Sequence, residues 1–120
     1  MFDIVAIIDK VLEPLSKEVK IKAGWYDENI KKTHITFCEL EDYTQDDSDD
    51  EEESITHTVQ VDVWGTDDEE TLKYKLACKD LLLKNDFTYT AGENLWETLK
   101  DGRILYHKAI KFKYLEVLNE

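Results

Sequence analysis

Residues 54–64, SITHTVQVDVW, give the clearest structural signal in the chain and decide its fold. The residues alternate strictly between two sets along this stretch. One set is Ile55, His57, Val59, Val61 and Val63, and the other is Thr56, Thr58, Gln60, Asp62 and Trp64. Because successive side chains of a β-strand point to opposite faces of the sheet, this alternation predicts a half-buried strand whose valines face a core.

The segments before this strand extend the sheet. Residues 33–43 (THITFCELEDY) predict a second strand, with Ile35 and Phe37 on one face. Residues 45–54 lie between the two strands and carry a block of charge that is too polar to pack. We therefore expect a long hairpin with an acidic, flexible tip. Further back, residues 19–23 (VKIKA) alternate and predict a short edge strand, because lysines discourage further strand pairing.

Two helices are expected beside the sheet. Residues 2–13 carry apolar side chains at the spacing of one helix face, and Pro14 should end that helix. The second helix is expected over residues 66–84, because Thr66-Asp67-Asp68-Glu69 has the pattern of a capping box. The residues predicted to form its core face are Leu72, Leu76, Ala77, Leu81 and Leu83.

The C-terminal third predicts another pair of strands. Asp101-Gly102 is a strong hairpin-turn signal and joins residues 95–100 to residues 103–116, and a strand at residues 87–90 precedes them. The predicted fold class is α+β: a single domain over residues 1–120, with a mainly antiparallel sheet and two helices packed on it. The element order is α-β-β-β-α-β-β.

Charge excludes some partners. Seven acidic residues between positions 46 and 53 supply about half of the net charge of −13. No basic patch is apparent that could displace counterions from phosphates, so we expect no direct nucleic-acid binding. No run of 18 apolar residues exists, so we expect no contact with a membrane.

No pattern in the sequence points to catalysis, a cofactor or a metal. Cys38 and Cys78 each lie in an apolar segment and are predicted to be reduced thiols of the core. The three histidines fall on different predicted strands: His57 is expected to be buried and satisfied, whereas His34 and His107 are expected to be solvated. Laid on the calcium-loop template, the acidic run has Glu51 where glycine is needed and His57 at the twelfth position. We therefore predict no enzyme and no metal site.

Aromatic side chains are the better functional signal. Trp25, Tyr26 and Trp96 fall in or near predicted turns, and exposed tryptophan and tyrosine often anchor protein interfaces. Trp64 belongs to the polar set of its strand, so it either joins this surface or packs under a loop or the second helix. The residues predicted to contact a partner are Trp25, Tyr26, Asp46, Asp47, Asp49, Asp50, Glu51, Glu52, Glu53, Trp64 and Trp96.

The order of these elements resembles the small tail-completion proteins (tail terminator, head–tail joining) of long-tailed bacteriophages and prophages. The segment VQVDVWG running directly into TDDEET carries most of the resemblance, followed by the ending YHKAIKFKYLE. The acidic run at residues 45–53 is longer and more charged than the hairpin tip typical of that family.

The resemblance implies a virion protein that assembles as a six-fold ring. Such a ring caps the tail tube and joins the tail to the head, with the tail tube protein and head connector or neck proteins as partners. It also implies that the protein lies at the head–tail interface of the virion, after a period in the host cytoplasm, and has no catalytic residues.

Two other classes fit the sequence. One is an acidic inhibitor that mimics DNA, although a mimic spreads its charge over a face and this chain concentrates about half of it in one run. The other is a different phage neck or adaptor protein.

Overall fold

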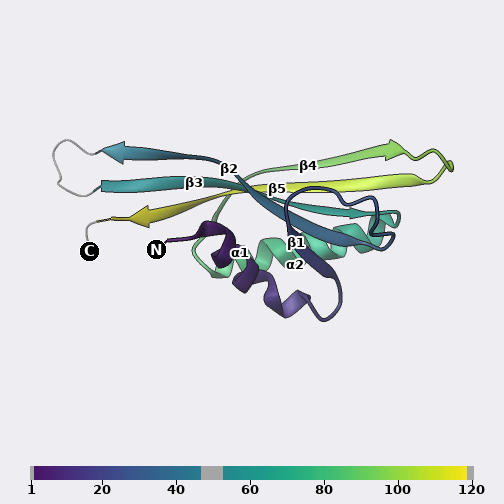
Figure 1. Cartoon of the computed structure of the whole chain (residues 1–120), viewed down its shortest axis with the longest axis horizontal. Coiled ribbons are helices and arrows are strands. Elements are labelled where there is room, and N and C mark those ends of the chain that lie inside the picture. Colours follow the sequence, from purple (N-terminus) through teal and green to yellow (C-terminus); the bar gives the residue numbers. More distant parts are fainter. Residues whose placement is uncertain (1, 47–52, 119–120) are drawn as a thin grey trace.

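Two long hairpins lie side by side and form most of the sheet, and a short fifth strand is added at one edge (Figure 1). The computed structural model describes residues 2–46 and 53–118. Its strands lie in the order β1-β2-β3-β5-β4, and every neighbouring pair is antiparallel except β1 and β2. The strands are β1 (Lys20–Ala23), β2 (His34–Asp46), β3 (Glu53–Gly65), β4 (Thr88–Thr98) and β5 (Ile104–Val117).

The helices cover one face of this sheet, as Figure 1 shows. The chain begins with α1 (Ile4–Leu12), which continues into a short 3₁₀ helix, η1 (Glu13–Leu15). The second helix, α2 (Asp68–Lys84), connects β3 to β4. The observed order, α-β-β-β-α-β-β, and the α+β class are those predicted from the sequence. None of the helices in the described part of the chain is both long and apolar enough to cross a membrane.

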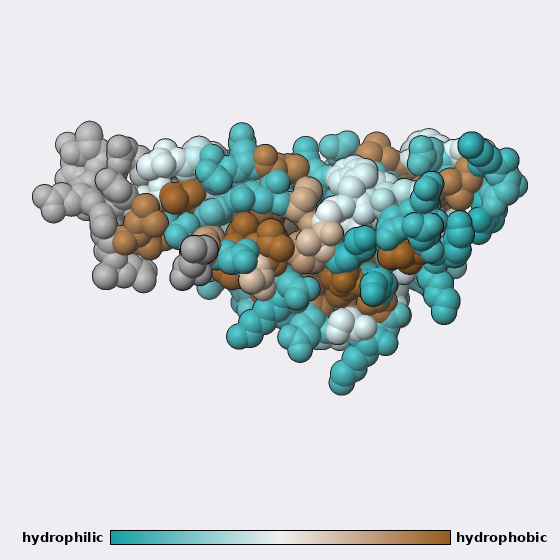
Figure 2. All heavy atoms as spheres, viewed as in Figure 1, coloured by the Kyte–Doolittle hydropathy of each residue, from teal (hydrophilic) through white to brown (hydrophobic). Residues whose placement is uncertain are grey.

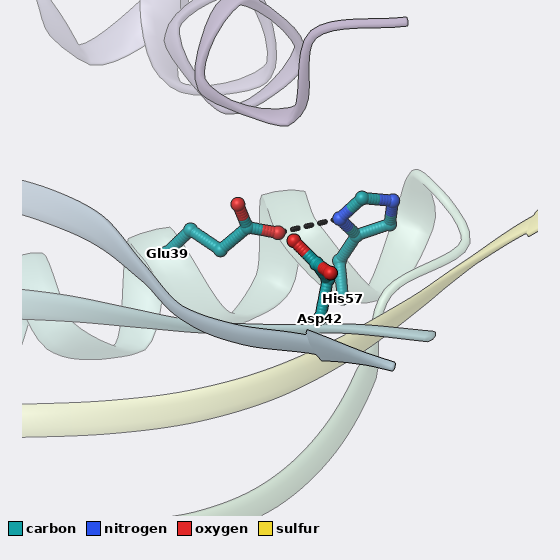
Figure 3. A group of neighbouring side chains, drawn as sticks. All are labelled: Glu39, Asp42 and His57. Carbon is teal, nitrogen blue, oxygen red and sulfur yellow. Dashed lines mark hydrogen bonds and ion pairs between the residues drawn. The ribbon is translucent and has the colours of Figure 1, made fainter. Parts of the chain in front are cut away.

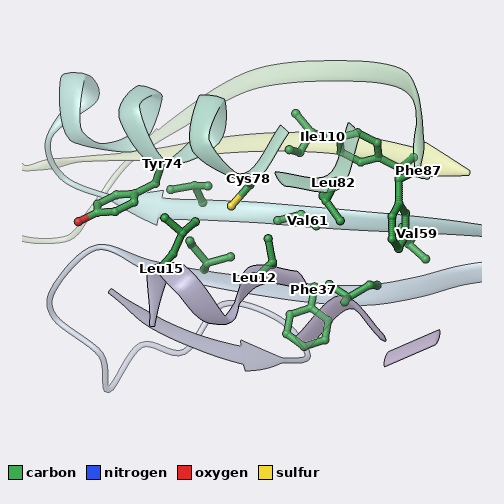
Figure 4. Close-up of a cluster of buried hydrophobic side chains, with 14 of the residues drawn as sticks. Leu12, Leu15, Phe37, Val59, Val61, Tyr74, Cys78, Leu82, Phe87 and Ile110 are labelled. Carbon is green, nitrogen blue, oxygen red and sulfur yellow. The ribbon is translucent and has the colours of Figure 1, made fainter. Parts of the chain in front are cut away.

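The core lies between the helices and the inner strands (Figure 4). The predicted valine face of β3 is confirmed, since Val59, Val61 and Val63 are fully buried. Helix α1 contributes Leu12 and strand β2 contributes Phe37 to the same cluster. At roughly 25 cal/mol for each Å² of apolar surface removed from water, burial of these side chains is the main force that holds the sheet to the helices.

The predicted core face of α2 is wrong for three of its five residues. Ala77 and Leu81 are half-buried and pack against the core as predicted. The residues that α2 buries are Thr71, Tyr74, Cys78 and Leu82, whereas Leu72, Leu76 and Leu83 are exposed. The buried residues recur at intervals of three or four, which is the repeat of one helix face. The predicted set could not form one face, because positions 72 and 81 lie nine residues, or about two and a half turns, apart.

The structure differs from the sequence-based predictions in the burial of β3, the N-cap of α2 and the bounds of β4. Strand β3 is not half-buried: Thr56, Gln60, Asp62 and Trp64, on the face away from the helices, are buried as well. The N-cap of α2 is Asp67 rather than Thr66, because the Asp67 side chain accepts a hydrogen bond from the Glu70 backbone. The segments at 87–90 and 95–100 belong to one strand, β4, with a bulge between Tyr89 and Ala91.

The acidic hairpin tip lies mostly outside the described residues. The pairing of β2 with β3 confirms the hairpin, and its last described pair is Asp46 with Glu53. The expected flexibility of residues 45–54 therefore stays a prediction. The described part of the molecule measures 57 × 26 × 22 Å, and the two hairpins extend toward opposite ends of its long axis (Figure 1).

Candidate interaction surface

The sheet face opposite the helices, here called the open face, carries a column of buried polar and aromatic groups. Trp64 of β3 and His107 of β5 are paired across the strands, and their rings stack with centroids 3.7 Å apart. The Trp64 indole N–H donates a hydrogen bond of 2.9 Å to Thr36 Oγ1 on β2. These contacts fix both rings on the open face.

A buried carboxylate lies beside this pair. Asp62 is fully buried, and its Oδ1 accepts hydrogen bonds from Gln60 Nε2 at 2.8 Å and from His107 Nε2 at 2.5 Å. Its Oδ2 has no hydrogen-bond partner among the described residues. Burial, with the Asp62 charge adding to it, raises the pKa of the neighbouring Cys38 thiol. Cys38 is therefore a neutral thiol and not a nucleophile at neutral pH.

The loop between β1 and β2 covers this column. Trp25 meets the rings of both Trp64 and His107 edge-on, with centroids 5.2 and 5.5 Å away, and Tyr26 lies 5.0 Å from Trp64. Trp64 is consequently buried, with only 4% of its surface exposed. Of the two alternatives for Trp64, packing under a loop is the one observed.

His34 holds the loop in this position. Its Nε2 accepts a hydrogen bond from the Asp27 backbone at 3.4 Å, and its Nδ1–H donates to the Lys32 carbonyl at 3.1 Å. Tyr26 stacks on the same ring at 5.5 Å. Burial lowers the pKa of His34, so the ring is neutral at pH 7. The prediction that His34 and His107 are solvated is therefore wrong.

The open face is hollowed next to the column, toward the edge strand β4. The hollow has a volume of about 290 Å³ and is lined by Trp25, Trp64, Leu95, Trp96, Glu97, Leu105 and His107. Trp25 is 52% exposed and Trp96 is 70% exposed. Leu95 pairs with His107 on the open face, whereas Trp96 pairs with Tyr106, so strand alternation directs the Trp96 side chain toward the opposite face of β4. Three of the aromatic residues proposed from the sequence thus meet around one hollow, although 71 positions separate Trp25 from Trp96.

The helix face carries a second group of polar side chains, shown in Figure 3. His57 of β3 lies between two carboxylates: its Nδ1 is 2.5 Å from Glu39 Oε2 and its Nε2 is 3.0 Å from Glu116 Oε1. Burial alone would lower the pKa of His57, but the hydrogen bonds to Glu39 and Glu116 outweigh it and raise the pKa. Asp42 lies beside Glu39 and His57, with the ligand-type atoms of all three within 4.8 Å of one another.

The acidic residues proposed as partner contacts do not join the hollow in the described structure. Asp46 and Glu53 pair at the far end of the β2–β3 hairpin, and residues 47–52 lie outside the described chain. The chain matches no protein-family model, and no curated protein is significantly similar to it in sequence.

Proposed function

We propose that the protein is a virion assembly subunit of the tail-completion kind, which caps the tail tube and joins tail to head. In this proposal, it acts through protein contacts, as a six-fold ring between the tail tube protein and the head connector or neck proteins. The observation that supports the proposal is the hollow of the open face at the β4 edge, which Trp25 borders from the loop before β2 and Trp96 from β4, and both tryptophans are exposed. Partly exposed tryptophans beside an apolar pocket are typical anchors of protein interfaces.

The edge strand β4 adds to this argument. It pairs only with β5, so its outer backbone groups face away from the sheet. Leu95 and Trp96 on this strand are exposed, and so is Ile104 on β5. Charged residues usually protect an edge strand, and β4 carries Glu93 and Glu97. The exposed apolar pair between them is consistent with a partner that contacts this edge. In Figure 2, apolar side chains also reach the surface in several patches among hydrophilic ones.

The distribution of charge fits contacts between neighbouring copies. The hollow near the turn between β4 and β5 is lined by four basic side chains, Lys31, Lys32, Lys100 and Arg103, and by two acidic ones, Glu28 and Asp101. Asp101 forms an ion pair with Arg103, so the hollow has a small excess of positive charge. A head-to-tail ring requires two different surfaces that complement each other, and this positively charged hollow could form one of them against the acidic surface of a neighbouring copy.

Deletion of the gene from its phage or prophage tests the proposal. We expect particles made without the protein to accumulate as filled heads and separate tails, with some tails of abnormal length. Electron microscopy of the lysate would show this directly. Intact, normally joined virions would overturn the proposal and favour the DNA-mimic class, whose members act on a host enzyme and compete with DNA in a salt-dependent way.

A further inference from the structure

We propose that Glu39, Asp42 and His57 form a binding site for a divalent transition-metal ion of the Zn²⁺ type. The site lies on the helix face of the sheet, away from the hollow, and does not depend on the proposed function. The three side chains come from two adjacent strands, and their ligand-type atoms lie within 4.8 Å of one another (Figure 3).

A β-bulge brings the two carboxylates to the same face. Positions 39 and 42 differ by an odd number, so in a regular strand their side chains would point to opposite faces. The pairing register between β2 and β3 shifts between Glu39 and Glu41, which leaves Leu40 as the extra residue. Glu39 then pairs with Val59 and Asp42 pairs with His57, and both face the helices. Bulges commonly redirect side chains in this way beside functional sites.

The surroundings of His57 resemble those of a metal-bound histidine, which usually donates its second ring N–H to a carboxylate. Its Nε2 lies 3.0 Å from Glu116, which can accept the ring proton and leave Nδ1 to face Glu39 and Asp42. A carboxylate behind a ligating histidine orients the ring and strengthens it as a ligand. Phe2 stacks on the same ring with centroids 4.8 Å apart, so packing also restrains it.

The cluster around His57 carries an excess of negative charge that a bound cation would offset. Three carboxylates, Glu39, Asp42 and Glu116, surround one imidazole, so the cluster carries an excess of at least two negative charges even with the ring protonated. Within residues 2–46 and 53–118, no lysine or arginine forms an ion pair with any of these carboxylates. A divalent ion would offset this excess.

The ligand types select the class of ion. An imidazole nitrogen with carboxylate oxygens suits Zn²⁺ and its first-row neighbours, whereas Mg²⁺ and Ca²⁺ prefer oxygen alone. Ligands at about 2.1 Å from a tetrahedral ion lie roughly 3.4 Å from each other, so the Glu39 and His57 side chains need to separate by about 1 Å. Asp42 is exposed and Glu39 partly so, which leaves coordination positions for water.

Binding of ZnCl₂ to the full chain tests the site by calorimetry at neutral pH, with MgCl₂ as the comparison. We expect one Zn²⁺ per chain and an affinity at least tenfold lower in Asp42→Asn, because loss of a ligand should cost no less than loss of a group that only orients a ligand. Glu41→Gln is the matched control. Glu41 lies on the same strand but pairs with Thr58 on the open face, and its substitution removes the same charge as Asp42→Asn. Its affinity should stay within twofold of the unmodified chain.

Two further measurements exclude binding by the acidic run. A variant with the carboxylates of residues 47–52 neutralised should keep the Zn²⁺ affinity, and loss of binding in it would overturn the proposal. The chain has only three histidines, so their ring signals can be followed separately by NMR. Zn²⁺ should shift the His57 signals at lower concentrations than it shifts those of His34 and His107. Equal affinities of Asp42→Asn and Glu41→Gln, or an unmoved His57 signal, would contradict the site.

Discussion

Leu82 and Leu83 are adjacent leucines on α2 that differ in environment, so the same substitution at each tests how this helix packs. Leu82 is fully buried against the sheet, whereas Leu83 is 48% exposed. Leu82→Ala removes buried methyl groups and leaves a cavity, which costs about 2–5 kcal/mol in closely packed cores. Leu83→Ala removes only partly buried atoms and replaces leucine with the best helix former, so we expect a change of about 0.5 kcal/mol or less.

Urea unfolding followed by circular dichroism measures the difference. A chain of this size has an m-value of about 1–3 kcal/mol/M, so Leu82→Ala should lower the midpoint by roughly 1–3 M. The midpoint of Leu83→Ala should stay close to that of the unmodified protein, and neither variant should change the m-value by much. Equal losses, or a larger loss for Leu83→Ala, would mean that α2 packs with the leucine face predicted from the sequence and not with the face observed.

Two other predictions follow from buried titratable groups. The pKa of folded His34 is lowered from 6.5 by burial, so its contribution to the free energy of unfolding should fall as pH drops below about 6.5. His57, whose folded pKa is raised, contributes in the opposite direction, so the His34 effect is the difference between the unmodified chain and His34→Gln. Urea midpoints at pH 7 and at about pH 5 would show this, and an unchanged slope in His34→Gln would contradict it. Burial raises the pKa of Cys78 to about 12, so in a Cys38→Ser chain its thiol should react with Ellman's reagent only after unfolding. Rapid labelling of the folded chain would place Cys78 outside the core.

The alternation at residues 54–64 was sufficient to predict the sheet, because a period of two places Val59, Val61 and Val63 on one face whatever surrounds them. The phase of α2 was not predictable from its leucines. Helix α2 is apolar on more than one side, and the sheet selected the side with Tyr74 and Cys78. Propensity and hydrophobicity do not rank two apolar faces of one helix, so tertiary packing decides between them.

The candidate sites, like the fold, were predictable from the sequence only in part. Trp25, Tyr26 and Trp96 were identified because they fall in or near predicted turns. Trp96 lies within β4, and the contacts of Trp25 and Tyr26 with Trp64 depend on how the loop after β1 folds over the open face. The group around His57 was missed, because a regular strand would separate Glu39 from Asp42. The bulge at Leu40 carries no glycine or proline to signal it. Strict alternation is therefore a poor guide to side-chain direction once a strand contains an extra residue.

Restoration of infectivity in a mixture of separated heads and tails tests the central claim, that this protein joins them through the surface around Trp25 and Trp96. The purified chain is added to a lysate of the deletion phage, and plaque-forming particles are counted. We expect the unmodified protein to restore the titre, and Trp25→Ala and Trp96→Ala to restore it at least tenfold less well, as for hot-spot residues that contribute about 1.4 kcal/mol or more. Leu115→Ala changes an exposed apolar residue of β5 near the other end of the sheet and should act like the unmodified chain. A titre that no form of the protein restores, or that both tryptophan variants restore fully, would contradict the account.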